Sequence, residues 1–279
     1  MSKEMNVQQI RAQIEQIDSL PTIPPLVRKL LMTIDSPTLS LTDMGKFVAK
    51  DQALTARLLK MVNSPIYGFP GRISSVSQAL ILLGLNVVKG ILLGVSVFEM
   101  MEKTMVGLWE HSLSTAVVAR GIAIKRELND PEEIMVSALL HDIGKVAMKA
   151  KFSPKYGEAL SMSEGAMVLI KDAEEKIFAI NHADAGGWLC QKWNFPLTLV
   201  EPIAYHHKPS LAKNALVQTE IVHVADILVR ARGFGFPGDR LIPAVNPEVW
   251  EKLHLSESEV RDLLTSMEDA IQEAADLVV

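Results

Sequence analysis

Residues 138–147, ALLHDIGKVA, place a histidine and an aspartate side by side in an apolar segment. The apolar residues on both sides of His141 and Asp142 predict a buried helix. A buried carboxylate normally pairs with a cation, becomes protonated or binds a metal ion, because burying an unpaired charge is costly. The doublet therefore marks a candidate metal site.

Further residues that can bind a metal lie within or at the end of other predicted helices, each with apolar neighbours: His111, His182, His206, His207 and Asp226. Successive helical residues point about 100° apart, so the doublet can straddle an ion but cannot enclose it. Helical bundles complete such centres with inward-facing side chains from several helices. A histidine-rich set with two aspartates favours a divalent transition metal (Fe, Mn, Zn or Ni), as one ion or two.

Each of these residues also has an ordinary explanation. A lone histidine such as His111 in an apolar helix is usually a core or surface residue. Asp226 could pair with Arg230, four residues later, on a solvated face. His206 and His207 could simply end a helix, where cations are favoured.

Other residues with reactive side chains carry weaker signals. Lys145 could cap the C-terminal end of its helix or contact a phosphate group as a point charge. We assign His223 a structural or supporting role and Cys190 a packing role, and His254 carries no signal. The set as a whole, rather than any one member, indicates a site.

The elements that must position these residues read as helices throughout, and no long segment alternates as a strand would. A helix is expected to start at Pro24 or Pro25, because proline suits the first helical turn. Asp130 is expected to cap a helix that has Pro131 in its first position. Ser256 and Glu259 have the spacing of a capping box. The sequence predicts an all-α fold.

Residues 79–101 form the most apolar segment, but Asn86, Lys89 and Glu99 interrupt it. We therefore interpret it as a core helix rather than a membrane span. Gly84, Gly90 and Gly94 lower its helix propensity, so we expect close packing at these positions. Prolines and glycines predict loops at residues 65–74 and 233–247.

Composition excludes some classes of protein. The 279 residues carry a net charge of −5, which argues against nucleic-acid binding. One cysteine, Cys190, cannot form an internal disulfide and fits a reducing compartment. The N-terminus has no apolar signal-peptide core. We expect a cytoplasmic protein that does not bind membranes.

A histidine and four later segments occur in an order that resembles the HD superfamily of metal-dependent phosphohydrolases, and in particular its HD-GYP branch. They are His111, HDIGK, NHADAGGWL, YHHKP and HVADIL. In that branch the matching residues bind metals and hydrolyse cyclic di-GMP. The Gly-Tyr-Pro signature that should follow His207 is missing here.

The first part of the chain resembles the HDOD family of bacterial signalling output domains. The resemblance lies in the segments LPTIPPL, DQALTARLLKMVNSPIYG and ISSVSQALILLGLNVVKGILL. Asp51-Gln52 replaces the usual Asp-Pro.

The HDOD resemblance implies an N-terminal helical subdomain (15–105) packed on an HD-like helical subdomain (106–232). A lead-in helix (1–14) would precede them, and a loop with a C-terminal helix (233–279) would pack on the HD-like part. It also implies a signalling module that acts through protein partners. Those partners would bind the apolar N-terminal helices or the exposed loop Arg232–Pro247.

A metal-dependent phosphohydrolase acting on a nucleotide or another phosphodiester is the alternative hypothesis. His141, Asp142, His182 and Asp226 would then bind the ion that activates water. His111, His206 and His207 would hold a second ion or the substrate, and Lys145 would contact phosphate. We favour the signalling module and expect its metal ion to be structural, linking four or five helices.

Overall fold

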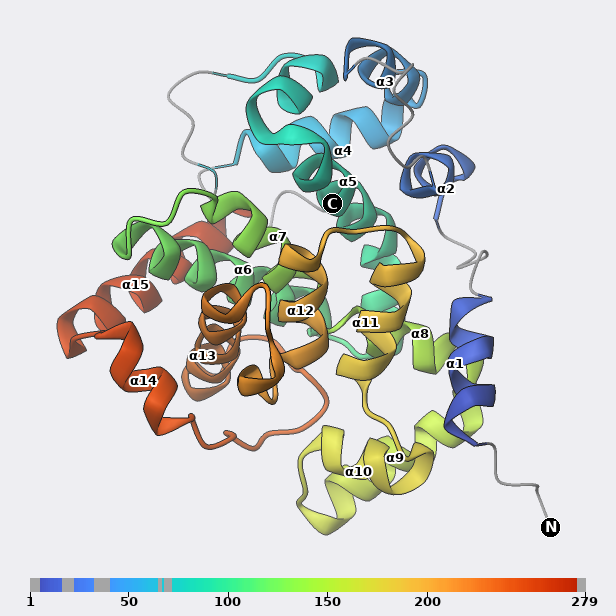
Figure 1. Ribbon diagram of the computed structural model, residues 1–279, viewed down its shortest axis with the longest axis vertical. Helices are drawn as coiled ribbons and strands as arrows, with labels where there is room; N and C mark the ends of the chain where they lie inside the picture. Colours follow the sequence, from blue (N-terminus) through green and yellow to red (C-terminus); the bar gives the residue numbers. More distant parts are fainter. Residues whose placement is uncertain (1–5, 17–22, 33–40, 65–66, 68–71, 275–279) are drawn as a thin grey trace.

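The computed structural model describes residues 6–16, 23–32, 41–64, 67 and 72–274. All regular elements within these ranges are helices, which confirms the predicted all-α class. Helices α2 to α4 and the start of α5 form one end of the molecule, whereas α1 lies with helices α6 to α15 and packs on α8 and α11 (Figure 1).

The N-terminal segment of the chain forms four short helices: α1 (Val7–Glu15), α2 (Pro25–Met32), α3 (Leu41–Val48) and α4 (Gln52–Val62). Helix α2 begins at Pro25, as predicted. Asp51 caps α4 by accepting a hydrogen bond from the amide of Leu54 at 3.0 Å. Most of the loop predicted at residues 65–74 lies outside the described residues.

Helix α5 (Val76–Thr104) connects the two parts of the molecule, because it packs on α2, α3 and α4 and also on α6, α7 and α8. Val136 and Leu139 of α7 lie where side chains at Gly90 and Gly94 would be, which confirms the predicted close packing there. At Gly84 that prediction was wrong, since no atom lies within 4 Å of a Cβ at this position. Gly84 has a φ of 79°, and α5 kinks there.

Helix α5 is also the one helix in the described part of the chain that is long and apolar enough to cross a membrane. However, 67% of its apolar window is buried inside the protein. Ile91, Leu92 and Leu93 are fully buried in the core. This burial agrees with the interpretation of the segment as a core helix.

The segment predicted to be the HD-like part (106–232) contains α6 (Leu108–Lys125), α7 (Pro131–Leu140), α8 (Ile143–Lys151), α9 (Ser153–Ala166), α10 (Ile170–Phe178), α11 (His182–Lys192), α12 (Leu197–Tyr205) and α13 (Leu216–Arg232), with a short 3₁₀ turn at Pro209–Leu211. Helix α7 begins at Pro131 as predicted, but the side chain of Asp130 makes no capping bond. That expectation was wrong because the ψ of Asp130 is 60°, outside the extended region that N-cap residues normally adopt.

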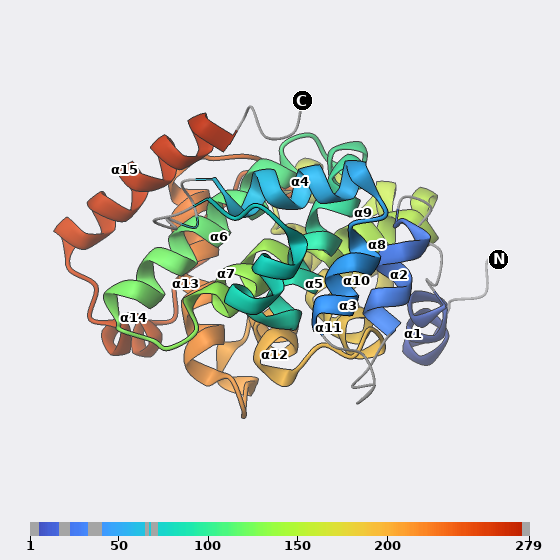
Figure 2. The ribbon, with the colours of Figure 1, turned by 90° about the horizontal axis from the view of Figure 1, so that it is seen from above.

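Two C-terminal helices, α14 (Pro247–Leu253) and α15 (Glu257–Ala274), complete the fold, and α15 packs back on α6 (Figure 2). The predicted capping box at the start of α15 is confirmed. The amide of Ser256 donates to Glu259 Oε2 at 2.9 Å, and the amide of Glu259 donates to Ser256 Oγ at 3.3 Å. Arg126, directly after α6, pairs with Glu259 at 3.2 Å and links α15 to the end of α6.

Residues 233–246 form a long loop between α13 and α14, as the glycines and prolines predicted. In Figure 1 the loop extends from α13 toward α9 and α10 before it returns to α14. It was expected to be exposed, but Pro237, Gly238 and Asp239 are buried. The expectation failed because Asp239 forms hydrogen bonds to two other segments, which draw this part of the loop into the protein.

Candidate metal centre

The seven predicted ligands come from helices α6, α7, α11, α12 and α13, mostly at helix ends. His111 lies in the first turn of α6, and His141 and Asp142 form the junction between α7 and α8. His182 is the first residue of α11, His206 and His207 follow α12, and Asp226 lies inside α13. Six of the seven are almost completely buried, and His207 is partly buried.

The side chains meet in three overlapping groups: His111, His141 and Asp226; His141, Asp142 and His206; and His182, His206 and His207. In each group the potential ligand atoms lie within 4.8 Å of one another. His141 and His206 each belong to two groups, so the three groups form one continuous cluster. The fold therefore brings together all seven residues that the sequence singled out.

Hydrogen bonds orient two of the histidine rings. The Nδ1 atom of His141 lies 2.7 Å from the carbonyl of Ala138, and that of His206 lies 2.9 Å from the carbonyl of Ile203. A carbonyl can only accept, so each Nδ1 carries the proton and donates. The Nε2 atoms of both rings are then unprotonated in the neutral imidazole, which is the form that binds a metal.

His182 is held by a carboxylate that was not predicted. Glu174 of α10 is fully buried, and its Oε2 accepts from His182 Nδ1 at 2.6 Å and from the His182 amide at 2.9 Å. Tyr156 donates its hydroxyl to the other oxygen at 2.9 Å. The available signal was the position of Glu174 on the apolar face of its helix, four residues after Ile170 and four before Phe178.

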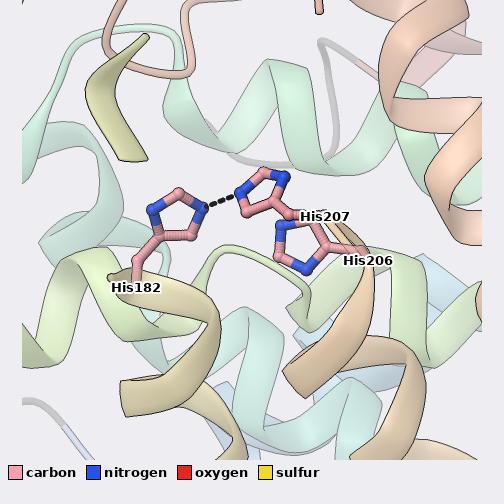
Figure 3. A group of neighbouring side chains, drawn as sticks. All are labelled: His182, His206 and His207. Carbon is pink, nitrogen blue, oxygen red and sulfur yellow. Dashed lines mark hydrogen bonds between the residues drawn. The ribbon is translucent and has the colours of Figure 1, made fainter. Parts of the chain in front are cut away.

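His182 and His207 face each other directly. Their Nε2 atoms lie 2.9 Å apart, as the dashed line in Figure 3 shows. His206 lies beside His207 at the end of α12, with ring centroids 3.9 Å apart. His182 Nε2 is also 3.1 Å from Asp142 Oδ1, which connects this group to the doublet.

Asp226 interacts on two sides. Its Oδ1 lies 3.1 Å from His111 Nε2 and 3.0 Å from Arg230 Nε. The alternative pairing of Asp226 with Arg230 thus occurs, but not on a solvated face, because both side chains are only 4% exposed. Arg230 also donates to Asp239 Oδ1 at 3.1 Å, a contact that bridges α13 and the following loop.

Lys145 is fully buried in the first turn of α8, and its Nζ lies 2.6 Å from Asp142 Oδ2. The expectation that it caps the C-terminal end of its helix was wrong, because the helix continues to Lys151. Lys145 thus pairs with one carboxylate oxygen of Asp142, and His182 lies beside the other. Its contact with a phosphate stays a prediction.

Several buried polar atoms of the cluster have no hydrogen-bond partner: Nε2 of His111, His141 and His206, and Oδ1 of Asp142. Although His111 Nε2 lies close to Asp226, the two are not oriented for a hydrogen bond. Unpaired buried polar atoms are costly, and such an atom in a native structure usually has a specific cause. Imidazole nitrogens and carboxylate oxygens that converge in this way fit a divalent transition metal.

The charge states also suit a metal ion. Burial lowers the pKa of His111 to about 4. Burial and the neighbouring histidines hold the pKa values of His206 and His207 well below the usual range. Burial alone would raise the pKa of Asp226, but Arg230 and His111 outweigh it and hold that pKa well below its ordinary value. These three histidines are therefore neutral and Asp226 is ionised, the forms that metals require. His182 differs, because burial alone would lower its pKa but Glu174 and Asp142 outweigh burial and raise it.

The remaining histidines lie outside the cluster. His223 has the predicted supporting position, since its Nδ1 donates to the carbonyl of His206 at 2.7 Å. The amide of Asn246 donates to His223 Nε2 at 3.3 Å. His254 is exposed at the end of α14. Cys190 is a buried packing residue, as expected.

Gly144 explains how the doublet approaches His182. A Cβ at Gly144 would lie 2.7 Å from the amide nitrogen of Gly186 and would also overlap the carbonyl of His182. The start of α8 therefore packs directly against the backbone of α11. Glycine is needed here to bring Asp142 and His182 to the same site.

Comparison with known proteins supports this architecture. The family model of the HDOD domain matches residues 20–209. An uncharacterised protein of Treponema pallidum is 26% identical over 200 residues, which cover 69% of this chain and 38% of that protein. Ribonuclease Y of Mycoplasmoides gallisepticum is 34% identical over 134 residues, 47% of this chain and 19% of that enzyme. The chain thus spans less than half the length of these two curated relatives.

Solved structures share the fold over nearly the whole chain. An HDOD domain protein of unknown function from Geobacter sulfurreducens is 23% identical, with a TM-score of 0.70 and coverage of 98% of both chains. A candidate phosphohydrolase from Shewanella amazonensis SB2B is 17% identical, with a TM-score of 0.68 and coverage of 96% and 98%. At these identities the likeness shows the fold alone.

Proposed function

We propose, since the chain belongs to the HDOD domain family, that it is a bacterial signal-transduction output module that acts through protein partners and retains a metal-binding HD site. The observation that carries this proposal is the closed cluster of seven donors. As whole residues, six of them are at most 3% exposed, and Lys145, which lies beside them, is paired with Asp142. Sites of this closed kind are typical of structural metal ions, whereas catalytic sites keep a position open to substrate.

A bound ion would supply a partner for the unpaired ring nitrogens and for Oδ1 of Asp142. His111, His141 and Asp226 would hold it from α6, α7 and α13. His182, His206 and His207 would bind from α11 and the end of α12. One or two divalent transition metal ions would in this way link five helices. We propose that the module presents this cross-linked HD-like part to its partners in the cytoplasm.

A metal-dependent phosphohydrolase is the second candidate, and a specific observation favours it. The donor set is complete, and His207 is partly exposed and adjoins two other donors, His182 and His206. The relative named Ribonuclease Y also supports a phosphodiester as the substrate class. In this case the bound metal would activate water and stabilise phosphoryl oxygens. His207 would then be the residue nearest to an incoming substrate.

Metal analysis and a hydrolysis assay separate the two candidates. Protein purified without chelator is expected to contain Fe, Mn, Zn or Ni, and His141→Ala is expected to lose it. Metal-loaded protein is expected not to hydrolyse bis(4-nitrophenyl) phosphate or cyclic dinucleotides above the rate of His141→Ala. Hydrolysis that depends on His141 would support the phosphohydrolase instead. Absence of bound metal, and no uptake when it is added, would refute both metal-dependent forms.

A further inference from the structure

A cavity outside the metal centre lies between the C-terminal end of α9 and the loop 233–246. Its volume is about 470 Å³, within the range of small-molecule sites. Most of its lining is apolar, with Met105, Leu160, Met167, Val168, Phe236 and Leu241 contributing. Gly238 makes room for it, because a Cβ there would lie 3.0 Å from Met105 Cε.

Four polar side chains line the same cavity, but two of them, Asp239 and Ser163, already form hydrogen bonds within the protein. Both oxygens of Asp239 accept hydrogen bonds, from Ile170, Leu241 and Arg230. Ser163 donates to the carbonyl of Val168 at 2.7 Å. Glu164 and Arg240 are exposed at the rim and form no hydrogen bond or ion pair with the described residues.

Arg240 is the better placed of the two charged residues. Its guanidinium lies over the ring of Phe236, 5.9 Å from the centroid, and Phe236 is itself part of the cavity lining. This contact holds the cation beside the apolar space. A guanidinium with uncommitted donors favours a carboxylate, sulfonate or phosphate group.

The loop that forms one wall of the cavity is connected to the metal centre through three intermediate residues, Gly107, Arg230 and His223. The amide of Phe236 donates to the carbonyl of Gly107 at 2.9 Å, and the same carbonyl accepts from the amide of His111. Asp239 binds Arg230, which binds Asp226. The amide of Asn246 donates to His223, whose ring donates to the carbonyl of His206.

From this geometry we propose that the cavity between α9 and the loop 233–246 is a binding site for a small molecule with an apolar body and one anionic group, and that its occupancy changes the metal affinity of the centre. The apolar body fills the space between Leu160, Met167 and Phe236, and the anion pairs with Arg240. The change in metal affinity, unlike the binding itself, rests on the proposed metal function. It follows because a ligand that moves the loop also moves the groups that hold His111, Asp226 and His206.

Binding is tested with 1-anilinonaphthalene-8-sulfonate, a fluorescent aromatic sulfonate, in the full chain. Arg240→Gln is expected to weaken its affinity about tenfold, the loss typical of one charge-assisted hydrogen bond. Arg232→Gln is the matched control, because Arg232 also lies over a phenylalanine, Phe234 at 5.9 Å, but does not line the cavity. Leu160→Trp is expected to abolish binding by filling the space.

Equal affinity of the wild type and both arginine variants would overturn the assigned anion site. So would equal affinity of the wild type for N-phenyl-1-naphthylamine, which lacks the sulfonate. If Leu160→Trp left the affinity for the sulfonate unchanged, the assignment of the binding site to this cavity would be wrong. Circular dichroism of each variant confirms that it is folded.

The link to the centre is tested by titrating Mn²⁺ calorimetrically with and without a saturating amount of the sulfonate. The Mn²⁺ affinity is expected to change at least about fivefold, and the sulfonate affinity to change by the same factor with Mn²⁺. Asp239→Asn is expected to bind the sulfonate but to lose this change. An unchanged Mn²⁺ affinity would refute the link. If Mn²⁺ does not bind at all, the proposed function fails and the link with it, while the fluorescence result still decides the cavity.

Discussion

At the scale of single residues, the candidate ligands are oriented by the atoms that face away from the cluster. The Nδ1–H groups of His141 and His206 each donate a hydrogen bond to the backbone carbonyl three residues earlier in the chain. His182 donates Nδ1 to the Glu174 carboxylate instead. Such partners fix the ring orientation and raise the basicity of the nitrogen that binds the metal.

We expect Glu174→Gln to weaken metal affinity about 10- to 100-fold, the usual loss when such a partner of a ligand is removed. The amide cannot supply the negative charge that His182 Nδ1 meets at 2.6 Å. Tyr156→Phe is the matched control, because it removes a bond to the other oxygen of Glu174 and leaves the His182 contact intact. Calorimetric titration with Mn²⁺ measures both, and an equal loss in the two variants would contradict the assigned role.

Cys190 should be chemically inert in the native protein. Its side chain is fully buried, and burial raises the pKa of the thiol to about 12. Because the thiolate is the reactive form, we expect no reaction with a disulfide reagent under native conditions and complete reaction in denaturant. Rapid stoichiometric labelling of the folded protein would show that this part of α11 opens.

At the scale of helices, close contacts between backbones place the ligands. Helix α8 meets α11 at Gly144, and α11 meets α12 at Gly187, where a Cβ would lie 2.7 Å from that of Ala204. The histidines of α11 and α12 therefore depend on small residues that lie outside the cluster.

We expect Gly144→Ala to destabilise the protein by roughly 1–3 kcal/mol, the usual cost of overpacking, because the obstructing atoms belong to the α11 backbone and cannot rotate away. Gly157→Ala in α9 is the matched control. Nothing lies within 4 Å of a Cβ there, so the change should stabilise the helix by about 0.5–1 kcal/mol. Urea unfolding measures both, and a neutral Gly144→Ala would contradict the close contact.

Glu201 connects α12 to the start of α13. Its Oε2 accepts hydrogen bonds from the amides of Lys213, Asn214 and Ala215 at 2.7–3.0 Å. Burial alone would raise the pKa of this carboxyl, but these bonds and one from the Asn214 side chain outweigh burial and lower it. The segment before α13, and with it Asp226, is held in this way.

A lowered native pKa means that Glu201 contributes stability above its ordinary pKa of 4.5, and that this contribution is lost as the pH falls through the native value. We therefore expect Glu201→Gln to lower the melting temperature at neutral pH. The difference from the wild type should shrink as the pH falls below that ordinary value. Melting curves over a pH series test this, and a difference independent of pH would contradict it.

At the scale of the whole molecule, the donors come from five helices and spread along the chain from His111 to Asp226. An ion that binds only the folded chain stabilises it by mass action. We expect Mn²⁺ at 100 times its dissociation constant to raise the free energy of unfolding by about 2.7 kcal/mol, and a chelator to reverse the effect.

Two variants control this experiment. Asp142→Ala should show no stabilisation by Mn²⁺, because Asp142 lies next to His141, His182 and Lys145 at the centre of the cluster. His254→Ala should retain it, since this histidine is exposed and outside the cluster. A melting temperature that chelation does not change, in protein shown to contain metal, would contradict a structural ion.

Much of the fold could be predicted from the sequence, because helix periodicity and caps are local. The starts of α2 and α15 and the capping box at Ser256 were predicted correctly. The capping bond expected from Asp130 does not form, because a cap also depends on a backbone angle that neighbouring segments determine. The kink at Gly84 was missed for a similar reason, since a glycine by itself does not show whether it serves packing or a positive φ.

By itself, the sequence determined which residues can bind a metal and that they lie in apolar helices, because donor chemistry and periodicity are properties of short segments. Only the tertiary structure decided that these residues share one cluster, that Asp226 pairs with Arg230 in the interior, and that Glu174 holds His182. The physical reason is that contacts between distant segments depend on how helices pack. Close approaches such as Gly144 on Gly186 set that packing, and no local pattern specifies which segments will meet.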